Sequence, residues 1–304
     1  MTRAATAARR PLGETASGYL FLLPWFIGLV VFMAGPTLVS LYLSFTNYNL
    51  LDPPKWIGAQ NYIRLFTLDR RYTSALQVTF TYVAVAAPLN LAFALALATA
   101  LNTRIRGLAF YRAVYYVPSL LGGSVAVSIL WRQIFGLNGI VGQVLEWFGI
   151  HGASWVSQPG QALSTLIILH VWQFGSPMVI FLAGLKQIPA ELYEAASIDG
   201  AGKWLQFRVI TLPMLTPVIF FNLILQIINS FQAFTPAFIV SGGTGGPIDS
   251  TLFYTLYLYI QGFANFRMGY ASAMGWILLV IIAAVTAVAF LTGRYWVHYA
   301  DSTP

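Results

Sequence analysis

One strongly apolar stretch of the chain carries side-chain amides at helical intervals. Asn222, Gln226 and Asn229 are spaced i, i+4 and i+7, and Gln232 follows them. At 100° per residue, the first three positions fall on one side of a helix. Amides in an apolar helix must face protein or water, and they can exchange hydrogen bonds with hydroxyl groups. The pattern indicates either a path for a hydroxyl-bearing solute or hydrogen bonds to a helix of a partner chain, and both interpretations remain open.

The segment that precedes this stretch predicts two short helices joined by a turn. Pro189 suits the first position of a helix, and Glu191 and Glu194 lie near the positive end of its dipole. Gly200 can take the left-handed conformation that ends a helix. A second short helix, over about 202–209, then leads into the apolar stretch.

The surface of the first short helix suits a protein partner. Ala195 and Ala196 are small, so the surface of a partner can approach the helix closely. Glu194 offers a negative charge for a basic group on that partner.

This segment resembles the EAA loop of ABC importer permeases. In that family Glu-Ala-Ala is followed after three residues by Gly and after nine more by Ile-x-Leu-Pro, and the spacing here is the same at every position. The matching residues are Glu194, Ala195, Ala196, Gly200, Ile210, Leu212 and Pro213. The resemblance implies that the 186–212 loop is a coupling helix that seats in a groove of a cytoplasmic ATPase subunit. The Asp199-Gly200-Ala201 variant of the loop suits sugar importers.

Other short matches resemble the MalF/UgpA-like branch of carbohydrate-importer permeases. They are Leu23-Pro24, Gly35-Pro36-Thr37, Ser44-Phe45-Thr46, Asn61-Tyr62, Leu65-Phe66 and the glycine-rich 241–247 segment. They imply a sugar as the solute, either an oligosaccharide, a disaccharide or a related polyol such as a glycerol phosphate. The large external insertion of the maltose-type member is absent, so the resemblance does not extend to that member's substrate.

The chain lacks the residues that would bind ATP. Its nearest approach to a Walker A motif ends in Gly200-Ala-Gly-Lys203, which is followed by Trp204 instead of Ser or Thr. We therefore expect no cofactor in this chain, with ATP and Mg bound by a partner ATPase. The nine acidic residues are spread thinly over the loops, which argues against a membrane enzyme.

The composition indicates that lipid surrounds most of the chain. Hydrophobic residues make up 58% of the 304 residues and charged residues only 8%, whereas soluble domains carry about a quarter charged residues. The net charge of +7 is divided among short segments between apolar runs, which argues against nucleic-acid binding. Cysteine is absent, which excludes disulfides and thiol chemistry.

Six apolar segments are each long enough for a spanning helix, which needs roughly 20 residues. They are 18–45, 76–101, 111–135, 162–185, 213–240 and 270–292. We therefore predict an all-α integral membrane protein with six transmembrane helices, and the resemblance implies the type I ABC importer permease fold. The chain then divides into a tail, 1–17, a first helix with an external segment, 18–75, a permease core, 76–296, and a second tail, 297–304.

The distribution of Lys and Arg predicts that both termini are cytoplasmic. The basic residues on that side are Arg3, Arg9, Arg10, Arg104, Arg106, Arg112, Lys186, Lys203, Arg208 and Arg294. The predicted external segments 136–161 and 241–269 hold one basic residue, Arg267. The external segment 46–75 disagrees, because it contains Lys55, Arg64, Arg70 and Arg71. We place the protein as a multi-pass protein in a bacterial cytoplasmic (inner) membrane.

The resemblance implies a set of partners. They are a second, homologous permease, two cytoplasmic ABC ATPase subunits and an extracytoplasmic solute-binding protein. Two other functions remain open, an ABC permease for a non-sugar solute and a secondary carrier. A carrier coupled to protons or sodium usually has ionisable or coordinating groups at mid-membrane. His170 is the one ionisable candidate well inside an apolar segment, and a hydrogen-bonded interior histidine explains it better than a proton relay.

Overall fold

The computed structural model of the chain describes residues 13–102, 107–149 and 154–298. Most of the predicted tails 1–17 and 297–304 lies outside the described residues. The same holds for five of the basic residues that predicted the orientation, which are Arg3, Arg9, Arg10, Arg104 and Arg106.

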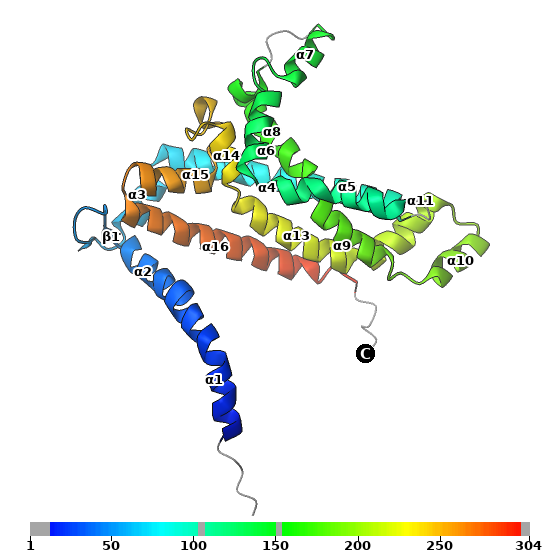
Figure 1. Ribbon diagram of the computed structural model, residues 1–304, viewed down its shortest axis with the longest axis horizontal. Coiled ribbons are helices and arrows are strands. Elements are labelled where there is room, and N and C mark those ends of the chain that lie inside the picture. Colours follow the sequence, from blue (N-terminus) through cyan, green and yellow to red (C-terminus); the bar gives the residue numbers. More distant parts are fainter. Residues whose placement is uncertain (1–12, 103–106, 150–153, 299–304) are drawn as a thin grey trace, which may run out of the picture.

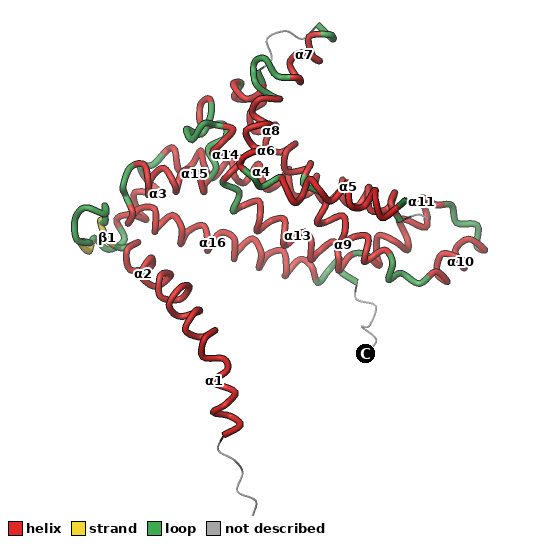
Figure 2. Tube along the Cα trace, viewed as in Figure 1, coloured by secondary structure: helices red, strands yellow, loops and turns green. Residues whose placement is uncertain are grey.

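The described chain is almost entirely helical, as predicted (Figure 2). Its first half contains α1 Gly13–Gly28, the π-helix η1 Leu29–Ala34, α2 Gly35–Ser44, β1 Thr46–Asn47, β2 Lys55–Trp56, α3 Gln60–Thr67, α4 Arg70–Leu101, α5 Leu108–Leu121, α6 Val125–Ile134 and α7 Ile140–Glu146. The two strands pair antiparallel, with Thr46 opposite Trp56.

The second half contains the helices that carry both predicted sites. They are η2 Trp155–Ser157, α8 Pro159–Trp172, α9 Gly175–Leu185, α10 Ala190–Ile198, α11 Lys203–Gln206, the π-helix η3 Phe207–Thr211, α12 Leu212–Met214, α13 Thr216–Phe231, α14 Thr235–Val240, η4 Pro247–Asp249, α15 Tyr254–Tyr259, the π-helix η5 Ile260–Ala264 and α16 Met268–Gly293.

The six predicted apolar segments correspond to six spans, but two of these spans are broken. Four stretches are long and apolar enough to cross a membrane by themselves, and they are Phe21–Ser44, Arg70–Leu101, Thr216–Val240 and Met268–Gly293. The third span consists of α5 and α6, which are bent by 95°, and the fourth of α8 and α9, which are bent by 42°. The sequence predicted one helix in each place. The break in the third span begins at Gly122, four residues after Pro118, and the break in the fourth span precedes Pro177.

Helix α4 is the centre of the bundle, where it packs against α8, α9, α13 and α15. Ala75, Ala86, Ala94 and Ala98 on this helix are completely buried. Small residues let neighbouring helices approach closely, which is how spanning helices gain packing contacts when lipid supplies no hydrophobic driving force.

The first span lies apart from this bundle, and only its α2 end packs against α16 (Figure 1). None of its most apolar window is buried within the chain, and Phe21 and Phe32 are 86% and 81% exposed. Lipid or another spanning helix must therefore cover this span in a membrane.

The predicted external segments 46–75 and 241–269 meet at one end of the bundle. Arg71 binds the Asp249 carboxylate through both Nε (2.9 Å) and Nη2 (2.6 Å). Asp69, which caps α4, accepts hydrogen bonds from the hydroxyls of Tyr257 (2.7 Å) and Tyr270 (2.5 Å). Helices α10 and α11 lie at the opposite end (Figure 1). These contacts agree with the prediction that the two segments share a side, despite the basic residues in the first.

Asp69 is a pH-sensitive part of this junction. Burial raises the pKa of its carboxyl, but the hydroxyls of Tyr270 and Tyr257 and the backbone N–H groups of Tyr72 and Arg71 lower that pKa by more. The net effect places the pKa of Asp69 below its usual value of 3.8. The carboxylate therefore contributes stability above about pH 4, and this contribution is lost as the pH falls through the lower pKa of the folded state.

Replacing Asp69 by Asn tests this junction. Asn is an equally good helix cap, but its neutral amide oxygen accepts weaker hydrogen bonds from the two tyrosine hydroxyls than a carboxylate does. We expect Asp69→Asn to lower the melting temperature in detergent by roughly 2–5 °C at pH 7, since the site is partly exposed. The difference from wild type should shrink as the pH falls below 4. An unchanged melting temperature at pH 7 would contradict the role of the charge.

Candidate functional site

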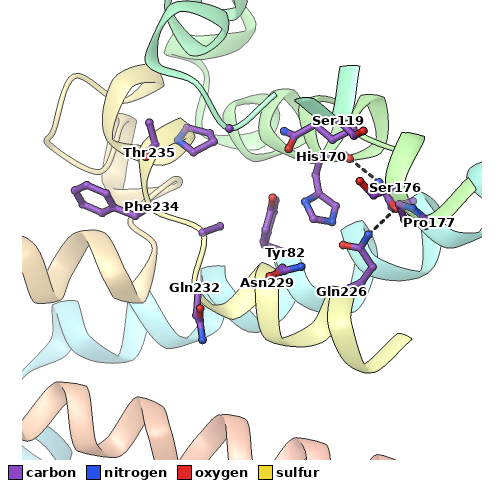
Figure 3. Close-up of a pocket in the computed structure, with 15 residues that line it drawn as sticks. Tyr82, Ser119, His170, Ser176, Pro177, Gln226, Asn229, Gln232, Phe234 and Thr235 are labelled. Carbon is purple, nitrogen blue, oxygen red and sulfur yellow. Dashed lines mark hydrogen bonds between the residues drawn. The ribbon is translucent and has the colours of Figure 1, made fainter. Parts of the chain in front are cut away.

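A cavity of about 350 Å³ lies among the spanning helices near the middle of the fold (Figure 3). Its lining is mostly polar but uncharged. The residues are Tyr82, Asn90, Ser119, Gly123, His170, Gln173, Ser176, Pro177, Gln226, Asn229, Gln232, Ala233, Phe234, Thr235 and Pro236. The cavity therefore offers amide, hydroxyl and imidazole groups beside the aromatic rings of Tyr82 and Phe234, a combination that can bind a small polar molecule.

The two broken spans meet at this cavity. The Gln173 side chain, at the α8–α9 break, donates from Nε2 to the Gly122 carbonyl at the α5–α6 break (3.2 Å) and to the Leu169 carbonyl (3.3 Å). A Cβ atom at Gly122 would lie 2.1 Å from Cγ of Gln173, so only glycine permits this approach. A helix break frees backbone carbonyls, which must find donors or water at membrane depth. Gln173 supplies donors to both breaks.

Asn90 joins three helices at the floor of the cavity. It is completely buried, its Nδ2 donates to the His170 carbonyl (2.7 Å), and its Oδ1 accepts from Nε2 of Gln226 (3.1 Å). These bonds connect α4, α8 and α13, and both are drawn dashed in Figure 3. His170 in turn lies 3.4 Å from the Ser230 hydroxyl through Nε2 and packs edge-on against Tyr82. This agrees with a hydrogen-bonded interior histidine.

The structure separates the four amides that the sequence grouped together. Gln226, Asn229 and Gln232 line the cavity, and the last of these caps the C-terminal end of α13. Asn222 does not line the cavity. It is 2% exposed and donates from Nδ2 to the Val218 carbonyl of its own helix (3.1 Å). One turn separates Asn222 from Gln226, so the helix passes from the packed end of the bundle to the cavity within that turn.

Sequence reasoning missed Asn90, Tyr82, Gly122 and Phe234. Asn90 had a usable signal, because a lone amide in the middle of an apolar segment must find a partner inside the protein. The others had none, since aromatic residues and glycines are frequent in all spans of this chain.

The segment that resembles an EAA loop folds as a hairpin of helices, α10 and α11, that projects from the opposite end of the bundle (Figure 1). The turn between them is a Schellman motif. The backbone N–H of Ala201 donates to the Ala196 carbonyl (2.8 Å), and that of Gly200 donates to the Ser197 carbonyl (3.1 Å). Gly200 has the predicted left-handed conformation, with φ at +82°.

Side chains that the sequence did not single out hold this hairpin together. Gln206 is 4% exposed, and its Nε2 donates to the Ser197 hydroxyl (2.9 Å) and to the Ala201 carbonyl (3.0 Å). The hydroxyls of Tyr193 and Thr211 lie 2.8 Å apart and join α10 to the end of η3. The hairpin is therefore fixed both at its turn and at its base.

The outer surface of the hairpin is apolar and lacks a partner within the described chain. Ile198, Trp204 and Val209 are 87%, 75% and 61% exposed. Glu194, Ala195 and Asp199 are also exposed on α10, and Ala196 and Ile210 line a pocket of about 220 Å³ between the two helices. Such an apolar patch with charged edges is typical of a protein interface.

Pro213 lies within a helical path and does not begin one, which corrects our expectation that it starts the fifth helix. The chain is helical from Lys203, and Leu212 and Pro213 are in the short helix α12 that follows the π-helix η3. Proline has no N–H to donate to the carbonyl of residue 209, so the preceding turn widens to the π form. The span itself begins after a break at Leu215.

Comparison with known proteins identifies the family. A family model described as the binding-protein-dependent transport system inner membrane component matches residues 91–297. The chain belongs to this family. This match covers the helical hairpin, four of the spans and the cavity residues from Ser119 onward, whereas Tyr82 and Asn90 precede it. It confirms that the protein is an integral membrane permease of an ABC transporter.

Relatives of this ABC permease align over nearly their full length. The probable ABC transporter permease protein YesP of Bacillus subtilis (strain 168) is 52% identical over 94% of this chain and 93% of its own. The lactose transport system permease protein LacF of Rhizobium radiobacter is 34% identical over 95% of this chain and 99% of its own.

A solved structure of the same fold comes from a bacterial ABC transporter involved in the import of the acidic polysaccharide alginate. It superposes with a TM-score of 0.74 at 23% identity and covers 91% of this chain and 94% of its own. The type I ABC importer permease fold is thereby confirmed.

The different positions of Gln226 and Asn222 predict different effects on transport by this permease. Gln226→Leu removes a donor from the cavity and leaves Oδ1 of Asn90 without its partner, whereas Asn222→Leu changes only a bond within one helix. We expect Gln226→Leu to lower solute uptake by about 10-fold or more and Asn222→Leu to lower it less than 2-fold, at equal amounts of folded protein. Equal losses would contradict the assignment of the cavity.

Proposed function

We propose that this chain is a permease subunit of an ATP-driven importer for a sugar, and that it forms part of the translocation path. The solute would be an oligosaccharide, a disaccharide or a related polyol such as a glycerol phosphate. The observation that carries the sugar assignment is the end-to-end alignment, at 34% identity, with a permease named for lactose transport. The uncharged cavity supports it, because amides and hydroxyls can exchange hydrogen bonds with sugar hydroxyls while Tyr82 and Phe234 pack against the ring.

The energy for transport comes from another chain in this proposal. The helical hairpin would dock on a cytoplasmic ATPase subunit, which binds ATP and Mg, and this chain would bind no cofactor itself. The exposed apolar side chains Ile198, Trp204 and Val209 supply the contact area. Glu194 offers a charge to a basic residue of the ATPase. The small residues Ala195 and Ala196 allow close approach.

The proposed assembly contains four other subunits. A second, homologous permease pairs with this chain, two ATPases bind the two hairpins, and an extracytoplasmic binding protein delivers the solute. The unburied first span fits this assembly, because a second permease can cover an apolar face that the chain leaves open. Both termini and the hairpin then lie in the cytoplasm, and the junction of Arg71 with Asp249 lies on the external side of a bacterial inner membrane.

Movement of the hairpin can reach the cavity along one helical path. Closure of the ATPases would pull the hairpin, whose base is fixed by Tyr193 and Thr211 to η3, the π-helix that leads through α12 into the fifth span. That span carries Gln226 and Asn229 into the cavity. A shift of α13 would break or remake the bond between Gln226 and Asn90, so that solute contacts change with the state of the ATPase.

Recruitment of an ATPase tests the proposal through two positions in the hairpin. A Cβ atom at Gly200 meets no heavy atom within 4 Å, so substitutions there act only through the backbone. Asn tolerates the left-handed conformation of this turn, whereas a β-branched residue does not. We expect wild type and Gly200→Asn to co-purify with the ATPase from detergent. Gly200→Val and Glu194→Lys should co-purify with less than about a tenth of the ATPase that wild type retains.

Stimulation of the assembled complex then identifies the solute. Complexes in liposomes are mixed with solute-binding proteins, each loaded with one sugar, and ATP hydrolysis is measured. We expect at least one sugar-loaded binding protein to stimulate hydrolysis several-fold. If wild type recruits no ATPase, or if Glu194→Lys and Gly200→Val recruit it normally, the coupling role of the hairpin is wrong. If only non-sugar ligands stimulate hydrolysis, the sugar assignment is wrong.

A further inference from the structure

The loop between α14 and α15, residues 241–251, holds a large apolar side chain in an unfavourable backbone conformation. Ile248 is 89% exposed and has φ at +52°, and Asp249 beside it has φ at +56°. The left-handed region is rare for residues other than Gly, Asn and Asp, and a β-branched residue there is an outlier. The strain persists only where the surroundings fix the backbone, and such positions gather at functional sites.

Contacts on both sides of Ile248 fix the loop. Arg71 binds the Asp249 carboxylate with two hydrogen bonds and also donates from Nη2 to the Thr244 carbonyl (3.3 Å). Thr251 donates from its N–H and its hydroxyl to the Gly245 carbonyl, both at 2.9 Å. Glycines supply four further positive φ angles in this loop, at Gly242, Gly243, Gly245 and Gly246. The result is a rigid platform that presents Ile248 outward.

The platform is continuous with the wall of the cavity. Helix α14 runs directly into it, and Thr235 and Pro236 in the first turn of α14 line the cavity. Figure 1 shows the loop projecting beyond α14 at the end of the bundle away from the helical hairpin. A molecule that binds Ile248 would therefore act on α14 and through it on the cavity.

We propose that Ile248 is an anchor residue for the extracytoplasmic solute-binding protein, seated in an apolar depression on that protein's surface. Three observations favour the solute-binding protein as the partner of Ile248. The loop is on the external side in the proposed orientation, the family depends on a binding protein, and the charges of Arg71 and Asp249 around the anchor give a polar rim of the kind that surrounds protein interfaces. A lipid tail fits this polar surrounding poorly. The inference rests on the proposed function, since it needs a binding protein that docks.

Three variants distinguish the effect of the Ile248 side chain from an effect of the loop backbone. Ile248→Asn removes the apolar group and suits the left-handed backbone, so the platform is kept. Ile248→Leu keeps an apolar group of the same size. Leu51→Asn is the matched control, because Leu51 is 86% exposed in the other external segment but has no positive φ.

The measurement is the Kd of the sugar-loaded binding protein, chosen as the one that stimulates the wild-type complex, for each complex in nanodiscs. We expect Ile248→Asn to raise Kd at least about 10-fold, with Ile248→Leu within about 3-fold of wild type and Leu51→Asn unchanged. Co-purification of the ATPase with each variant shows that it is folded and assembled.

Two results would overturn the anchor. One is a Kd for Ile248→Asn equal to that of wild type. The other is an increase in Kd for Leu51→Asn as large as that for Ile248→Asn, which would indicate nonspecific hydrophobic binding. A third result is a wild-type complex that binds no solute-binding protein at all. That result would overturn the proposed function and the anchor with it.

Discussion

Asn90 supplies the polar contact on which the centre of this permease depends. A buried amide in a lipid-surrounded bundle must find hydrogen-bond partners in the protein or its cavity, because lipid supplies none. Asn90 meets this requirement by bonding the His170 carbonyl near the α8–α9 break and the Gln226 side chain on α13. The first bond lies within one turn of the end of α8, and the second positions one of the cavity's amides. Asn90 thus links one of the two broken spans to the polar cavity.

The second organising feature is the physical continuity between the helical hairpin and the cavity. Gln206 and the pair Tyr193 and Thr211 hold α10, α11 and η3 together, and α12 connects them to the fifth span. The π-helix before Pro213 and the break at Leu215 are the places where this path can bend. A binding event on the hairpin and a change in the cavity can therefore be linked by the movement of a few packed helices, without contact between the two sites.

Most of the fold could be predicted from sequence, because length and apolarity determine spanning segments and a fixed-spacing motif determines the hairpin. The left-handed conformation of Gly200 was predictable, because a glycine at the end of a short helix commonly adopts it. The helix breaks were not, because Pro88 lies inside the continuous helix α4 whereas Pro118 and Pro177 lie beside breaks. The side-chain partners across helices also escaped prediction. Asn222 and Gln226 share a helical face in the sequence, and only the packing of α4 and α8 decides that one of them faces the cavity.

Uptake of a labelled sugar into proteoliposomes tests most directly the claim that a cavity in this chain is driven by an ATPase bound to its hairpin. The vesicles would carry the complete complex, with sugar-loaded binding protein outside and ATP enclosed. We predict uptake that requires enclosed ATP and persists when ionophores abolish ion gradients. Uptake that continues without ATP and stops when the ion gradients are abolished would contradict it, and would make the chain a secondary carrier.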